Sequence, residues 1–257
     1  MSRMHRAGMA VVVGALALGA AATAQAQIQG MPLFTNPRVG TGIRIHADLG
    51  LPTAKPDSVV AGIQNYSVIQ GGVMVALGRL GIGANVGATR NDFKTFTSGA
   101  SSYNVGPQTK VTASVLAQLR VAGGGASPLA LSIFGGASTD ISAYSFSGLP
   151  DSIKSQLGGS SKVLTVPAGV ALGLRLPLVI INPTVWGSGR MNFTKILNCP
   201  SGSSCPSQKG EFRWAVGADI PLFSIISLRA AFESGKLLGQ TVSNFGVGAS
   251  IGLGGMR

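Results

Sequence analysis

The strongest constraint on the fold is an alternation of apolar and polar residues that recurs along most of the chain. In residues 111–121, Val, Ala and Leu occupy every second position, whereas mostly Thr, Ser, Gln and Arg lie between them. Successive side chains of a β-strand point to opposite faces, so this period of two predicts strands with one apolar face and one small or polar face. Residues 38–50 and 245–253 repeat the pattern.

The alternation predicts an all-β fold of ten antiparallel strands, with eight as the alternative if 38–50 or 225–234 does not join the sheet. The connections between them alternate in length: tight ones near 79–81, 123–125, 176–178 and 221–223, and long ones rich in Ser, Gly, Asn and Pro at 51–65, 93–110, 142–162 and 191–210. The 235–242 link is shorter but still polar. The predicted strands are 38–50, 66–79, 80–92, 111–122, 129–141, 163–176, 178–190, 211–220, 225–234 and 243–254.

The N-terminus predicts an export signal. Two basic residues, Arg3 and Arg6, precede an apolar run from Met9 to Ala22, and a small-x-small sequence typical of signal-peptidase sites ends at Ala26. A membrane anchor needs about 20 apolar residues, and this run is shorter. The predicted parts are therefore a cleaved signal peptide at 1–26, a short lead at 27–37 and a β-barrel at 38–257.

Charge distinguishes the two ways in which such strands can form a barrel. A soluble, lipocalin-like barrel turns its apolar face inward and its polar face to water. Only 11% of this chain is charged, against about 25% in ordinary soluble domains, and the minor face is largely Gly and Ser with isolated Arg. That face is poor cover in water, so the apolar face is expected to meet lipid. A soluble periplasmic barrel that binds an apolar ligand is the alternative.

An export signal, an even number of antiparallel strands, short turns at one end and long polar loops at the other resemble a bacterial outer-membrane β-barrel. The resemblance covers residues 38–254 and is one of pattern, without a sequence motif. It implies an up-and-down transmembrane barrel in the outer membrane, with the bilayer as its partner. Both termini would face the periplasm and the long loops the exterior. The oligomeric state stays open, with a monomer as the default.

Charged residues on the minor face are expected to meet inside the barrel, because an unpaired charge facing lipid is costly. The interior of a small barrel is just filled by side chains, which favours an ion-pair network that closes the lumen. Since arginines outnumber acids in this set, a narrow pore for anions or small polar solutes is the alternative. The predicted lumen residues are Arg38, Arg44, Asp48, Arg79, Arg120, Arg175, Glu211, Arg213, Asp219, Arg229 and Glu233.

The remaining chemistry points away from an enzyme. His46 shares a strand face with Asp48, but no third catalytic group is identifiable, and no His or Cys cluster could bind a metal. No catalytic, cofactor-binding or metal-binding residue is therefore predicted. In an oxidising, exported setting, Cys199 and Cys205 are expected to form a disulfide in a polar loop.

The net charge of +12 is spread singly along the chain, so no nucleic-acid partner is expected. Part of the positive excess falls in the long loops, where it would favour an anionic outer leaflet. The expected function is a structural or surface-interaction role through external loops.

Overall fold

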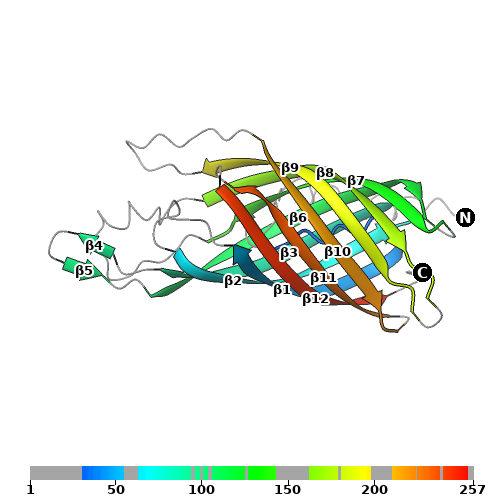
Figure 1. The fold of residues 1–257 in the computed structure, drawn as a ribbon, viewed down its shortest axis with the longest axis horizontal. Coiled ribbons are helices and arrows are strands. Elements are labelled where there is room, and N and C mark those ends of the chain that lie inside the picture. Colours follow the sequence, from blue (N-terminus) through cyan, green and yellow to red (C-terminus); the bar gives the residue numbers. More distant parts are fainter. Residues whose placement is uncertain are drawn as a thin grey trace, which may run out of the picture.

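The computed structural model describes residues 31–54, 63–93, 96–98, 101–103, 106–124, 127–142, 162–178, 181–197, 210–223, 225–237 and 240–253. Ten long strands form one closed antiparallel barrel, in which β1 pairs with both β2 and β12 (Figure 1). The prediction of ten strands is confirmed, and both strands that the eight-stranded alternative left out lie in the wall. The barrel strands are β1 (Thr41–Ala54), β2 (Ile63–Leu77), β3 (Leu80–Phe93), β6 (Pro107–Gly123), β7 (Leu129–Asp140), β8 (Lys162–Arg175), β9 (Thr184–Leu197), β10 (Glu211–Pro221), β11 (Ile226–Leu237) and β12 (Gln240–Leu253).

The connections divide the barrel into two ends. The turn end carries the links β2–β3, β6–β7, β8–β9 and β10–β11, together with the start of β1 and the end of β12. The loop end carries the other five links. A separate hairpin of β4 (Phe96–Ser98) and β5 (Ser101–Tyr103) belongs to the β3–β6 link and extends beyond the barrel wall (Figure 1).

Two predicted connections are wrong in length. The strand predicted at 178–190 lies at Thr184–Leu197, so residues 176–183 form a longer link at the turn end. The apolar run that suggested the earlier start lies between Pro177 and Pro183, and proline cannot donate a ladder hydrogen bond. At the loop end, β11 and β12 are separated only by residues 238–239.

The apolar face of the strands points outward, as predicted. Large apolar side chains are exposed around the wall, such as Ile69 (61%) and Val170 (53%). The interior holds buried polar and charged side chains instead, including Gln118, Arg190 and Glu233. This is the arrangement of a membrane-spanning barrel, in which every backbone group is paired and lipid meets only apolar atoms. A soluble barrel with an apolar interior does not fit it.

Among the described residues, no helix is long and apolar enough to cross a bilayer.

The tight β2–β3 hairpin turns at Gly78, whose φ of 75° is readily adopted by glycine.

Candidate functional site in the barrel lumen

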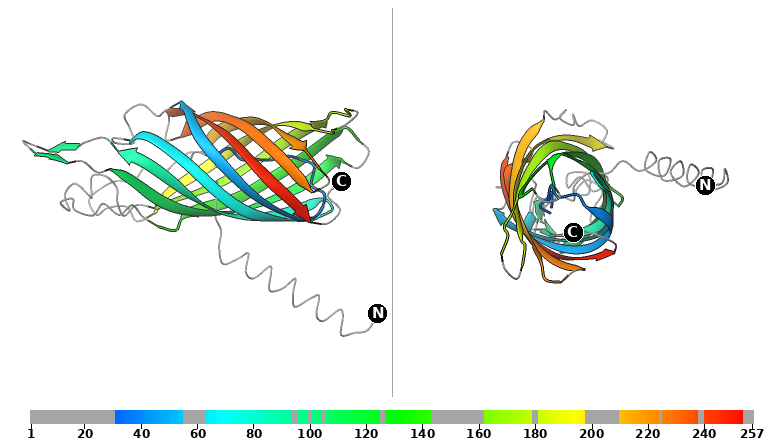
Figure 2. Two further views of the ribbon diagram at one scale, coloured as in Figure 1. Left: turned by 90° about the horizontal axis from the view of Figure 1, so that it is seen from below. Right: turned by 90° about the vertical axis from the view of Figure 1, so that its right-hand side faces the viewer.

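Residues 31–40, here called the lead, run inside the barrel before the chain enters the wall at Thr41. Figure 2 shows this segment, in blue, within the ring of strands seen end on. Met31 is 1% exposed and Thr35 is fully buried. From the sequence, a lead was predicted at 27–37 without a position inside the barrel. Residues 38–40 were predicted to belong to the first strand.

Apolar side chains of the lead contact the wall around most of its circumference. Leu33 packs against Leu116 of β6, Phe134 of β7 and Ala171 of β8. Phe34 packs against two further clusters, which bring in β2, β9, β10 and β11. Those clusters consist of Met31 with Val68, and of Trp186 with Ala215 and Ala231. The lead therefore fills the cross-section of the barrel at this depth.

Three hydrogen bonds hold the lead to the wall, one at Leu33 and two at Asn36. The Leu33 backbone N–H donates to Glu233 Oε2 at 3.1 Å, and Asn36 Nδ2 donates to Asp219 Oδ2 at 2.7 Å. The Gln118 amide donates to the Asn36 carbonyl at 2.9 Å. Each bond satisfies a polar group that would otherwise be buried without a partner.

Glycines on the inner face of the wall leave room for the two prolines of the lead. A Cβ added at Gly246 would lie 2.8 Å from Pro32 Cδ, and one at Gly173 would lie 2.6 Å from Pro37 Cγ. Both distances are too short for real contacts. The glycine-rich minor face thus creates space for an internal segment.

Two ion-pair groups occupy the lumen beside the lead. In the first, Asp48 accepts two hydrogen bonds from Arg229, one of them from Nε at 2.7 Å. The guanidinium of Arg229 lies 4.4 Å from the ring centroid of Phe34, a cation–π contact that ties the lead to this pair.

In the second group, Glu233 lies between two arginines. Its carboxylate is 2.7 Å from Arg190 Nη2 and 3.0 Å from Arg213 Nη1. The side chains of Glu233 and Arg190 are completely buried. One carboxylate therefore compensates two buried charges and also accepts the Leu33 N–H.

His46 lies in the same lumen and has structural partners. Its Nε2 is 2.7 Å from Asn85 Oδ1 and 3.7 Å from Asp48 Oδ2, and the Asn85 amide donates to Ser114. In the part of the chain that the structure describes, no group of three or more His, Cys, Asp or Glu side chains could hold a metal ion.

The predicted charge network is distributed over the lumen and its turn end. Asp48, Arg213, Arg229 and Glu233 form the two ion-pair groups. Glu211 starts β10 at the loop end. Arg44, Arg120, Arg175 and Asp219 line a cavity at the turn end together with Arg38, which lies in the lead and not on a strand. The prediction is wrong for Arg79, which is exposed in the β2–β3 turn.

Three charged residues of the structure, Arg190, Lys110 and Asp140, were absent from the predicted network. Arg190 is the last residue of the strand predicted at 178–190, next to a predicted loop. In the structure it lies within β9, and its side chain is buried inside the barrel. Lys110 Nζ lies 2.6 Å from Asp140 Oδ2 between β6 and β7. With the correct strand boundaries, the alternation of side chains would have placed all three on the inward face.

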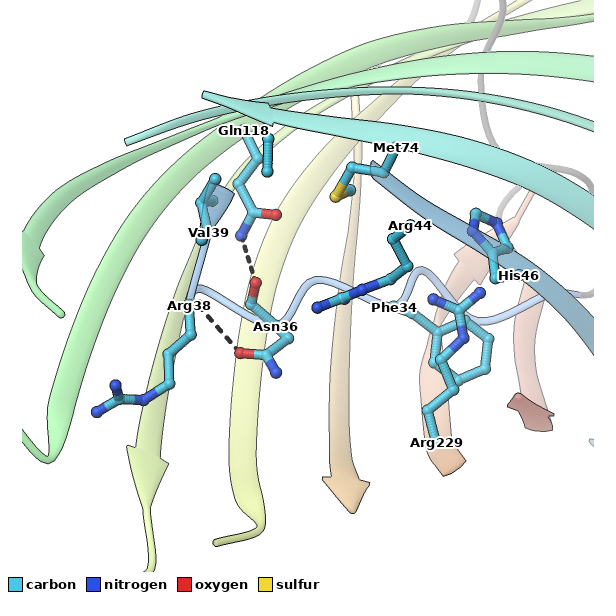
Figure 3. A pocket seen from close by; sticks show the side chains of 11 residues that line it. Phe34, Asn36, Arg38, Val39, Arg44, His46, Met74, Gln118 and Arg229 are labelled. Carbon is cyan, nitrogen blue, oxygen red and sulfur yellow. Dashed lines mark hydrogen bonds between the residues drawn. The ribbon is translucent and has the colours of Figure 1, made fainter. Parts of the chain in front are cut away.

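Space inside the lumen is small. Two pockets beside the lead, lined in part by Phe34 and His46, hold about 20 and about 30 Å³, room for a water molecule or two. A larger cavity of about 140 Å³ lies at the turn end. Figure 3 shows Arg44 extending from β1 into the space beside Asn36 of the lead.

Two predictions fall outside the described residues: the signal peptide at 1–26 and the disulfide between Cys199 and Cys205. Both stay predictions.

No family profile and no curated protein matches the chain. Solved structures with a similar arrangement include the translocator domain of the autotransporter NalP from Neisseria meningitidis, at 15% identity over 97% of this chain and 98% of that one, with a TM-score of 0.43. The β domain of the Bordetella autotransporter BrkA is 10% identical over 82% and 99%, with a TM-score of 0.46. Ail of Yersinia pestis is 12% identical over 83% and 99%, with a TM-score of 0.37.

The strand pairing and the orientation of the side chains themselves define the architecture. A closed antiparallel wall, apolar outside and charged inside, is one of the two structures that can span a bilayer. This chain has the fold of a bacterial outer-membrane β-barrel with an internal N-terminal segment.

Proposed function

We propose that the protein is a closed, non-conducting barrel of the outer membrane that acts through the connections at its loop end. The observation that carries this proposal is the lead, which contacts seven of the ten wall strands and fills the cross-section of the barrel at its depth. Hydrated solutes need a continuous path, and the pockets beside the lead hold only about 20 and 30 Å³.

The loop end is suited to contacts outside the membrane. Its links include 55–62, 94–106, 141–161 and 198–210, and the β4–β5 hairpin extends one of them past the wall (Figure 1). These four links hold four lysines and two aspartates, a net charge of +2 that favours an anionic surface such as the outer leaflet only weakly. A rigid barrel that displays long connections is a suitable scaffold for surface interactions.

Conductance across a planar lipid bilayer tests the closed state. We expect the wild-type barrel to give no steady conductance, whereas deletion of residues 31–40 opens a channel. Heat-modifiable mobility on gels confirms that each preparation is folded. Steady conductance of the folded wild-type protein would contradict the proposal and favour the alternative of a small pore for anions or polar solutes.

Tag accessibility tests the location and the orientation. An epitope inserted in the 141–161 link is expected to bind antibody on intact cells. The matched control is the same epitope in the 124–128 turn, which is expected to react only after the outer membrane is permeabilised. Recovery of the protein in the soluble periplasmic fraction, or equal reactivity of both tags on intact cells, would refute the proposed placement.

A further inference from the structure

The cavity at the turn end concentrates positive charge. It has a volume of about 140 Å³, and four arginines from four separate segments face a single carboxylate across it. Arg38 comes from the lead, Arg44 from β1, Arg120 from β6 and Arg175 from the end of β8. The carboxylate is that of Asp219.

These arginines retain donors without partners. The guanidiniums of Arg44 and Arg175 form no hydrogen bond or ion pair within the described part of the chain. Arg38 and Arg120 are each held through a terminal nitrogen: Arg38 donates to the Pro128 carbonyl at 2.7 Å and Arg120 to the Val39 carbonyl at 2.6 Å. Their Nε atoms are buried and have no hydrogen-bond partner there.

Asp219 does not neutralise the cluster. Its two carboxylate oxygens accept hydrogen bonds from Asn36 Nδ2 at 2.7 Å and from Trp186 Nε1 at 3.4 Å. Burial, followed by the guanidiniums of Arg175 and Arg120, lowers the pKa of Arg38 from its usual value. Charges of one sign that lie close together destabilise each other unless an opposite charge joins them.

We propose that this cavity binds the phosphate or sulfate group of a small water-soluble compound that enters from the turn end. Guanidinium groups match tetrahedral oxyanions because they donate parallel N–H bonds to two oxygens. The volume has room for several water molecules and therefore for a phosphate-sized group. Asn182, in the β8–β9 link, lines the cavity and places it at the mouth of the barrel.

The site goes beyond the function proposed above. The lead forms part of its wall through Asn36 and Val39, so the bound anion is held at the mouth and does not pass through. Anion binding is measured separately from conductance. The binding site can therefore be disproved while the closed barrel stands, and the closed barrel can be disproved while the binding site stands.

Calorimetric titration of the folded full-length protein at low ionic strength tests the site. Inorganic phosphate and sulfate are expected to bind saturably, and glycerol phosphate is expected to bind at least as tightly. Short-chain phosphatidic acid serves as the lipid arm: preferential binding of this lipid over every soluble anion would overturn the water-soluble ligand. Saturable binding of no anion would overturn the site.

Matched variants separate the site from general charge effects. Arg44→Gln and Arg175→Gln are each expected to weaken phosphate binding by about tenfold or more, since each removes charge-assisted hydrogen bonds. Arg79→Gln is the control, because Arg79 is exposed in a turn at the same end, outside the cavity. Equal weakening by Arg79→Gln and Arg175→Gln would contradict the proposal.

Thermal unfolding provides a readout that a purely structural role would not give. Phosphate is expected to raise the Tm of the wild-type barrel but not that of Arg175→Gln. Without phosphate, Arg175→Gln is expected to be at least as stable as the wild type, because it relieves repulsion within the cluster. Clear destabilisation of phosphate-free Arg175→Gln would assign this arginine to the packing of the barrel and overturn its role in binding.

Discussion

Replacing Glu233 by Gln tests whether the lumen is held together by the charge group around this residue. The carboxylate is completely buried, and it pairs with Arg190 at 2.7 Å and with Arg213 at 3.0 Å. The neutral amide keeps the size of the side chain and can still accept the Leu33 N–H. The substitution therefore removes the negative charge while largely preserving the packing.

The expected loss of stability is large. Breaking a buried ion pair from one side costs about 3–5 kcal/mol, because the remaining charge has no compensation. Here two buried guanidiniums would be left, with side chains that are 0% and 3% exposed. Since the free energy of unfolding of a protein is typically about 5–15 kcal/mol, the variant should unfold at a markedly lower denaturant concentration.

Urea unfolding in lipid vesicles, followed by the fluorescence of Trp186 and Trp214, measures this loss. Asp92→Asn is the matched control, because its partner Arg90 is 3.6 Å away and the two side chains are 45% and 61% exposed. Such a surface pair contributes less than about 1 kcal/mol. If Glu233→Gln and Asp92→Asn lower the free energy of unfolding equally, the lumen group is not a major source of stability and our reasoning fails.

Three further outcomes are expected. Gly72→Ala should destabilise the barrel by about 1–3 kcal/mol, because an inward Cβ would lie 2.6 Å from the Ala84 carbonyl oxygen, whereas Gly71→Ala on the outer face should change the free energy of unfolding by less than about 0.5 kcal/mol in the same urea assay. Val170→Arg, which puts a charge on the lipid-facing wall, should lower stability in vesicles by up to about 2–4 kcal/mol, and an unchanged midpoint would contradict the outward orientation. The two cysteines of the β9–β10 link should resist alkylation until a reductant is added, as mass spectrometry can show, and alkylation of the untreated, folded protein would disprove the disulfide.

The strands were predictable because each one carries its own period of two. Between Pro177 and Pro183 the sequence is an apolar run without alternation. The prediction assigned this run to a strand and therefore started β9 too early. That shift moved Arg190 to the edge of a predicted loop and hid its place in the lumen. Local pattern therefore identifies an outward or inward face only when the strand boundaries are correct.

The internal position of the lead could not be read from its own residues. It has no periodicity, and two prolines exclude it from the interior of a sheet. Its partners Glu233 and Asp219 lie 200 and 183 positions away along the chain. The only sequence signal is indirect. Gly173 and Gly246 lie on the inward face, and larger residues would be expected there if the barrel enclosed only the side chains of its own strands.

The placement of the lead also orders the events of folding. Its neighbours lie on strands up to β12, and the Leu33–Glu233 hydrogen bond spans 200 positions of the chain. Contacts of such long sequence separation form late, after the entropy of a large loop has been lost. The segment that precedes every strand in the chain is therefore expected to dock only when the wall is nearly complete.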